Sequence, residues 1–87
     1  MNSSREPFRP QRMQLTAIAN GASGRVCALE GLAEVCERLR EMGIGEGVVI
    51  KRMSGQGTLL CLVGHTRIAL SEQAAGHIVV ELLPSAH

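Results

Sequence analysis

The sequence predicts a mainly β fold, a small open barrel of five to six short strands with one inserted α-helix at residues 32–42. Two observations predict it. One stretch carries apolar residues at helical spacing and ends at a glycine. The rest of the chain consists of short apolar runs separated by glycine-containing turns, which are typical of short strands. With 87 residues, the chain has room for one domain with a modest core.

The chain before the predicted helix is expected to hold a tail and one or two strands. Residues 1–13 contain two prolines and three arginines, so they predict a flexible N-terminal tail, with the domain spanning residues 14–83. The N-terminus lacks the apolar segment of a secretory signal. Residues 15–19 predict a short strand or extended lead-in. After a turn at 21–24, residues 24–29 predict a strand.

The predicted helix has the clearest local signals in the chain. Five residues at helical spacing form its apolar stripe: Leu32, Val35, Cys36, Leu39 and Met42. Gly43 follows the stripe and suits the left-handed backbone just past a helix end, because any Cβ there costs energy. Ile44 is then placed to fold back onto Leu39, as in a Schellman ending.

The rest of the chain is expected to form four strands and a single helical turn. The predicted segments are strands at residues 48–53, 58–63, 66–70 and 77–83, a helical turn at 71–75 and a frayed C-terminus at 84–87. Gly64 and His65 predict a two-residue type II′ hairpin. Ser71 is a candidate N-cap for the helical turn, which Gly76 ends. One real helix among these strands favours an SH3-like barrel over a ferredoxin-like sandwich, which needs a second helix.

The composition argues against several function classes. The formal net charge is +1, and the chain has no Asp, Trp or Tyr and a single Phe, Phe8. Without Asp, neither an Asp-supported triad nor an Asp-held magnesium site can form in its usual way. Without aromatic stacking or a basic excess, nucleic-acid binding is not expected. No nucleophile, base and orienting group appear together, so the chain is predicted not to be an enzyme.

The cysteines indicate a reducing compartment. Cys27, Cys36 and Cys61 form an odd set without a C-x-x-C pair, which argues against a disulfide framework or a zinc knuckle. Each lies in an apolar run, so each is expected to pack as a small hydrophobe. No run approaches membrane-spanning length. A cytoplasmic location is therefore predicted.

Three groups of residues resemble a known family. Residues 39–48 (LREMGIGEGV) carry a helix through a glycine-rich turn into a strand, and residues 68–70 and 78–80 form a second pattern. With Leu15, Gly21 and residues 24–26, these patterns resemble the ferrous iron transport protein A family, FeoA, a group of small SH3-like barrels. The chain departs from the family pattern at Met42, Glu46 and Ser71, where leucine, proline and a basic residue are usual.

The resemblance implies a non-enzymatic accessory protein of bacterial ferrous iron uptake. Its expected partner is the transporter FeoB, with the transporter's cytosolic GTP-binding domain as the contact and membrane association only through that partner. Whether the GTPase would be stimulated or restrained is left open. The same barrel occurs at the C-terminus of iron-dependent repressors of the diphtheria-toxin-repressor type. The alternative is therefore a metal-responsive regulatory or oligomerisation module, because a fold alone does not fix a function.

The charged face of the predicted helix is the leading candidate for partner docking. It presents Arg38, Arg40 and Glu41 on a rigid element, and Arg25 and Arg67 on strands are grouped with it. Charged helix faces are often merely solvated, which is the alternative interpretation.

A weak metal site is a second hypothesis. His65 is expected at a hairpin tip, whereas His77 and Glu81 share one face of the last strand by the period-two rule. Such nitrogen and oxygen ligands could hold zinc or iron weakly at the surface. Four ligands at structural-zinc spacing are not visible, so no cofactor is required.

Self-association is the last open alternative. The strand at 77–83 is a candidate sheet edge, and exposed edges can pair with a second chain. A homodimer through this strand is therefore one expectation.

Overall fold

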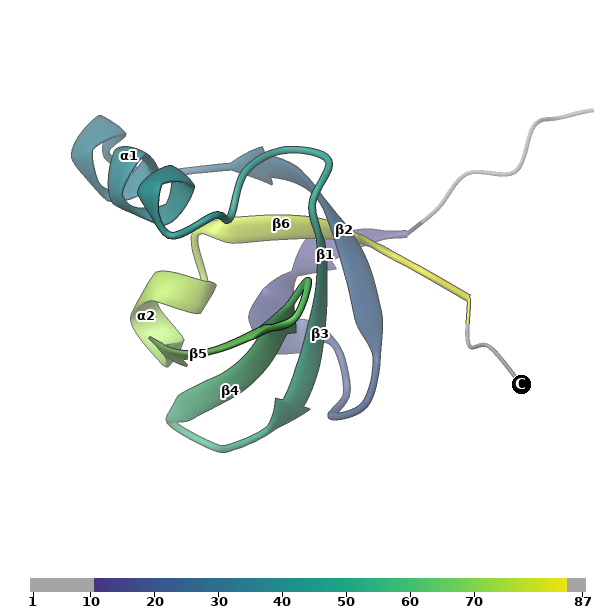
Figure 1. The fold of residues 1–87 in the computed structure, drawn as a ribbon. Coiled ribbons are helices and arrows are strands. Elements are labelled where there is room, and N and C mark those ends of the chain that lie inside the picture. The colour runs from purple at the N-terminus through teal and green to yellow at the C-terminus, as the bar shows by residue number, and fades with distance from the viewer. Residues whose placement is uncertain (1–10, 85–87) are drawn as a thin grey trace, which may run out of the picture.

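The computed structural model describes residues 11–84 and shows one curled antiparallel sheet with short helices at its ends (Figure 1). Its elements are β1 (Arg12–Gln14), the 3₁₀ turn η2 (Leu15–Ala17), β2 (Ser23–Leu29), α1 (Ala33–Glu41), β3 (Val49–Ser54), β4 (Thr58–Val63), β5 (Thr66–Ser71), α2 (Glu72–Ala75) and β6 (Ile78–Leu82). The sheet order is β1-β6-β2-β3-β4-β5. The predicted mainly β fold of five to six strands with one inserted helix is confirmed.

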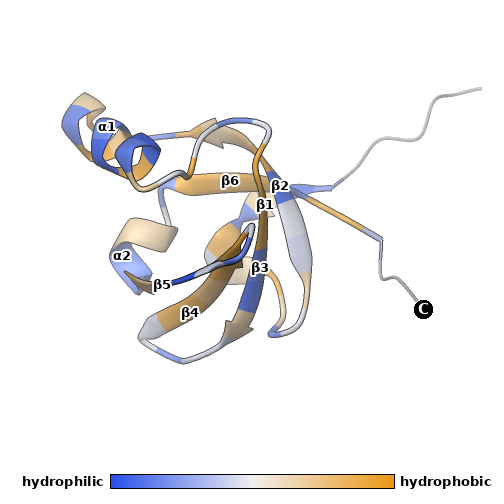
Figure 2. Cartoon of the chain, viewed as in Figure 1, coloured by the Kyte–Doolittle hydropathy of each residue, from blue (hydrophilic) through white to orange (hydrophobic). Residues whose placement is uncertain are grey.

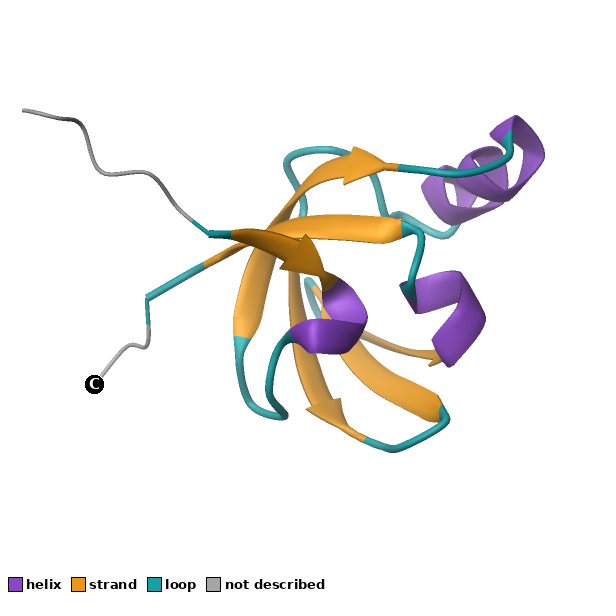
Figure 3. Ribbon diagram, turned by 180° about the vertical axis from the view of Figure 1, so that it is seen from behind, coloured by secondary structure: helices purple, strands orange, loops and turns teal. Residues whose placement is uncertain are grey.

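The N-terminal elements differ from the prediction. β1 pairs with β6, so Arg12 and Met13 belong to the sheet although the sequence placed them in the tail. Residues 15–19 do not form the predicted strand, because η2 turns the chain directly after β1 (Figure 3) and carries Leu15 fully into the core. Local sequence cannot show this, since the partner of β1 lies at the other end of the chain. Residues 1–10 of the predicted tail and residues 85–87 lie outside the described residues.

Helix α1 ends as its sequence predicts. Gly43 has a φ of +93°, and its amide donates to the carbonyl of Arg40 at 3.0 Å. The Ile44 amide donates to the carbonyl of Leu39 at 2.9 Å, which completes the Schellman ending. Ile44 is fully buried, so the local ending also anchors the helix to the core.

The two predicted turns around β5 are also present. Val63 pairs with Thr66 across the two-residue loop, and Gly64 has a φ of +62° as the hairpin requires. At the other end of β5, the Ser71 hydroxyl accepts a hydrogen bond from the Ala74 amide at 3.0 Å. Ser71 is thus the N-cap of α2, which fixes the direction in which the chain leaves the strand.

The last strand is not a sheet edge, which corrects the expected dimer contact. β6 pairs with β1 on one side and with β2 on the other. Its backbone groups are therefore engaged within the chain. The two edges of the described sheet are β1 and β5.

The core fills the inside of the curled sheet. Its largest fully buried side chains come from η2, the segment after α1 and strands β2, β3, β4 and β6: Leu15, Val26, Ile44, Ile50, Leu59, Cys61, Ile78 and Val80. β4 and β6 are apolar along most of their length, whereas β3 and β5 also carry hydrophilic residues (Figure 2). Cys36 and Cys61 are buried free thiols, as predicted, whereas Cys27 is half-buried and donates to the Val79 carbonyl at 3.4 Å. Burial raises the pKa of the Cys61 thiol.

One charged side chain holds two loops against β3. The Arg52 guanidinium donates to the carbonyls of Thr16 and Ile18 at 2.9 and 2.8 Å and to that of Gly55 at 3.1 Å. Its main chain joins the same contact, because the Arg52 amide donates to the Ala22 carbonyl at 2.9 Å. Arg52 therefore ties the η2–β2 loop to the β3–β4 turn.

Within residues 11–84, neither helix has the length or the apolar run needed to cross a bilayer.

Candidate functional site

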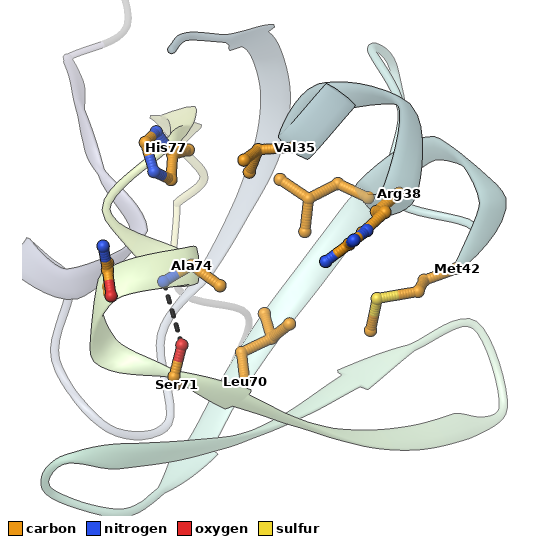
Figure 4. Close-up of a pocket in the computed structure, with 9 residues that line it drawn as sticks. Val35, Arg38, Met42, Leu70, Ser71, Ala74 and His77 are labelled. Carbon is orange, nitrogen blue, oxygen red and sulfur yellow. Dashed lines mark hydrogen bonds between the residues drawn. The ribbon is translucent and has the colours of Figure 1, made fainter. Parts of the chain in front are cut away.

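A groove with a volume of about 320 Å³ lies between α1, α2 and the end of β5 (Figure 4). The residues that line it are Val35, Arg38, Leu39, Met42, Leu70, Ser71, Gln73, Ala74 and His77. Its floor is aliphatic, and its rim carries one guanidinium, one hydroxyl, one amide and one imidazole. No carboxylate lines it.

The groove arises because the apolar stripe of α1 is longer than the surface that covers it. The middle of the stripe, Cys36 and Leu39, is buried against the barrel. The ends of the stripe are not, since Leu32 is 68% exposed and Met42 is 46% exposed. An unpartnered apolar helix face of this kind is typical of a surface that another chain covers.

His77 has a defined orientation at one end of the groove. Its Nδ1 lies 2.8 Å from the Glu30 carbonyl, and a carbonyl can only accept, so Nδ1 carries the proton in the neutral ring. Nε2 is then left as an acceptor. Gly31 makes this arrangement possible, because a Cβ there would collide with the imidazole. The main chain adds a second link, as the Glu30 amide donates to the His77 carbonyl at 2.8 Å.

Arg38 is the predicted docking residue that the structure places in the groove. Figure 4 shows its guanidinium projecting from α1 across the apolar floor. Arg40 and Glu41 on α1, Arg25 on β2 and Arg67 on β5 are exposed and are not among the residues that line the groove. The structure thus separates one member of the predicted set from the other four. A docking role for any of them stays a prediction.

Arg40 is engaged by a carboxylate beyond the helix end. Its guanidinium lies 3.0 Å from Glu46, which follows the glycine-rich turn. The hydrogen bond and the charge of Arg40 lower the pKa of the Glu46 carboxyl. The favourable pairing is therefore complete above the ordinary glutamate pKa of about 4.3 and is lost as the pH falls through the lowered value.

We expect the substitution Arg40→Gln to raise the pKa of Glu46 towards its ordinary value, because the hydrogen bond and the positive charge are both removed. An NMR titration of the Glu46 side-chain carboxyl carbon measures this directly. Arg38→Gln, on the same helix, is the matched control and should leave the Glu46 titration unchanged. Equal titration curves for the parent and Arg40→Gln would show that the ion pair is absent in solution.

The predicted metal ligands are not brought together. His65 lies at the β4–β5 hairpin, His77 is at the groove, and Glu81 lies 3.5 Å from Arg12. His77 and Glu81 are four positions apart along extended chain, which separates their Cα atoms by about 13 Å, too far for one ion to bind both side chains. In the part of the chain that the structure describes, no three His, Cys, Asp or Glu side chains form a metal-binding group.

The sequence did not predict the groove itself. Leu70, Gln73 and Ala74 line it from β5 and α2, and none of them was a predicted site residue. One signal was present: the stripe from Leu32 to Met42 spans more helix than a barrel this small can cover.

A family model and the solved structures give the comparison with known proteins. The family model of the FeoA domain matches residues 13–82. A crystal structure of an iron uptake regulatory protein, FeoA, has 26% identity and a TM-score of 0.79, with 84% of this chain and 99% of that chain covered. A search of curated proteins found no match.

Two further solved structures extend the comparison. Stenotrophomonas maltophilia FeoA, solved with zinc and described as an SH3 domain protein and a candidate activating factor of ferrous iron transport, has 30% identity and a TM-score of 0.70. The match covers 79% of this chain and 89% of that one. A manganese-dependent transcriptional repressor has 19% identity and a TM-score of 0.78, with 93% and 47% covered. At that identity, the repressor shows the shared fold alone. The predicted SH3-like fold is confirmed.

Proposed function

Because the chain belongs to the FeoA domain family, we propose that it is a non-enzymatic accessory protein of bacterial ferrous iron uptake that binds a FeoB-type transporter at its cytosolic GTP-binding domain. Two neighbours support this role, since one is described as an iron uptake regulatory protein and the other as a candidate activating factor of ferrous iron transport. The proposed site of contact is the groove between α1, α2 and β5, on the cytoplasmic side of the membrane.

The observation that carries the proposal is the chemistry of this groove. Its floor of Val35, Leu39 and Leu70 suits the apolar side chains of another protein, and Arg38 supplies a cation that no carboxylate of the lining neutralises. A partner segment with both apolar and acidic side chains is complementary to that surface. Met42, at one exposed end of the α1 stripe, lines the groove, and Leu32, at the other end, adds exposed apolar area outside it.

The same chemistry argues for binding rather than catalysis. The groove holds only two strongly polar ionisable side chains, Arg38 and His77. One ring nitrogen of His77 is already bonded to the Glu30 carbonyl. The Ser71 hydroxyl accepts the Ala74 amide as a helix cap, 3.0 Å away. Acyl or phosphoryl transfer needs a nucleophile with an adjacent base and an orienting group, and the groove lining does not assemble one.

The decisive experiment is a calorimetric titration of the protein into the cytosolic GTP-binding domain of the transporter from the same organism. It is run with GDP and with a non-hydrolysable GTP analogue. We expect saturable binding in at least one nucleotide state, because the groove offers apolar area and a cation together. Absence of binding in both states, with both proteins folded and the GTP-binding domain loaded, would overturn the proposal.

The alternative function is a metal-responsive regulatory module, and it makes a different prediction. It requires selective, tight binding of Fe²⁺ and an associated change in oligomeric state. Equilibrium dialysis with Fe²⁺ and Zn²⁺, followed by sedimentation of the loaded protein, tests this. Tight Fe²⁺ binding without transporter binding would favour the regulatory module.

A further inference from the structure

The edge strand β5 has unused backbone hydrogen-bonding groups. Val63 and Thr66 flank a two-residue hairpin loop and form a hydrogen-bonded pair. Because hydrogen-bonded and non-hydrogen-bonded pairs alternate between antiparallel strands, hydrogen bonds to β4 recur at every second residue of β5. Ile68 and Leu70 therefore bond to β4, while the amide and carbonyl groups of Arg67 and Ala69 point away from it. Among residues 11–84, no other backbone group bonds to those of Arg67 or Ala69.

This free edge borders the groove. Leu70 and Ser71, which continue β5 from Ala69, both line it. Figure 4 shows them on β5 with α1 and Arg38 across the open space. Ala69 is exposed and small, so nothing on its side chain blocks the approach of another strand. An extended segment laid along β5 would direct alternate side chains to the apolar floor, because side chains alternate along a strand.

The charges near this edge select the kind of segment. Arg67 lies on the edge itself, and Arg38 projects into the groove. Both side chains are cations, and the residues that line the groove include no carboxylate. The Nε2 of His77 adds an acceptor at the far end, which suits a hydroxyl or amide donor. An acidic and apolar segment matches the two cations and the apolar floor of the groove, and a hydroxyl or amide group of the same segment would match Nε2 of His77.

We infer that the free edge of β5, through the backbone of Arg67 and Ala69, receives an extended acidic and apolar segment of the transporter as a seventh strand whose apolar side chains fill the groove. This inference rests on the proposed function and specifies the bound segment. A helical segment would satisfy its own backbone and leave the edge groups unused. A second copy of this chain matches less well, because two β5 edges would bring two sets of Arg38 and Arg67 together.

The first test changes one backbone donor. Ala69→Pro removes the outward amide while leaving the bonds of Ile68 and Leu70 to β4 intact, and proline is tolerated on strand edges. Ala69→Ser keeps the amide and a similar size, so it is the matched control. We expect Ala69→Pro to weaken binding of the transporter's GTP-binding domain about tenfold, and Ala69→Ser to change it less than twofold. Both variants should melt near the parent temperature. Unchanged affinity in a folded Ala69→Pro would overturn strand addition.

The second test needs no substitution. Amide hydrogen exchange followed by NMR should show protected amides at Ile68 and Leu70 in the free protein and fast exchange at Arg67 and Ala69. On binding the GTP-binding domain, we expect new protection at Arg67 and Ala69. Binding without that protection overturns the inference and leaves the proposed function standing. No binding at all overturns both. Protection that instead grows with the concentration of the free protein would identify a second copy as the occupant and overturn the transporter segment.

Discussion

The substitution Arg38→Glu is expected to weaken binding of the transporter's GTP-binding domain by at least about tenfold, equivalent to about 1.4 kcal/mol. Arg38 is the cation that lines the groove, and its replacement by a carboxylate turns attraction for an acidic segment into repulsion. The side chain is on the rim of α1 and takes no part in the buried core. The fold should therefore be unaffected, and calorimetry with a melting curve measures both properties.

The matched control for this prediction is Arg25→Glu. It makes the same change in charge on an exposed side chain of β2, outside the groove lining. We expect its affinity to stay within about twofold of the parent, since distant exposed charges are largely screened. If Arg25→Glu weakens binding as much as Arg38→Glu, the affinity depends on the overall charge of the protein, and the groove is not the docking site. A loss of affinity at Arg25 alone would move the site to β2.

Replacing Arg52 with methionine should lower the free energy of unfolding by about 2 kcal/mol. Methionine keeps much of the aliphatic stem but leaves the carbonyls of Thr16, Ile18 and Gly55 without their donors. A domain of this size is typically stable by about 5 kcal/mol, so the loss would be a large part of the total. Equilibrium unfolding in urea, followed by circular dichroism, measures it.

Lys51→Met is the control for Arg52→Met. Lys51 is the neighbouring residue on β3 and is exposed, so removing its charge should change stability by less than about 0.5 kcal/mol. The two variants share the same strand and the same change in net charge. Equal losses for both would contradict the role of Arg52 as the link between the two loops.

The course of helix α1 was predictable because its signals are local. The stripe that ends at Met42, the left-handed Gly43 and the returning Ile44 all lie within a few residues of one another. The hairpin at Gly64 and the cap at Ser71 were predictable for the same reason. Each depends on short-range sterics or on one hydrogen bond between near neighbours, and residue type alone specifies these.

The candidate site was only partly predictable. Arg38 was chosen from the sequence because it lies on a rigid charged face, and the structure places it at the groove. Arg67 was chosen with it, yet it lies on the strand edge beside the groove. His77 was considered as a metal ligand, whereas the structure bonds its Nδ1 to the Glu30 carbonyl. These outcomes depend on which distant segments of the chain come into contact, and the sequence alone does not specify those contacts.

The sequence by itself determined the class of fold, the single long helix and the turns, because periodicity, capping and glycine conformations act over a few residues. Only the tertiary structure decided three other matters. It paired Arg12 with Glu81 and made β6 an interior strand. It turned Leu15 inward, and it left the edge of β5 open beside an apolar groove. The physical reason is that strand pairing and groove formation join residues far apart in the chain, and their free energy depends on the whole packed core.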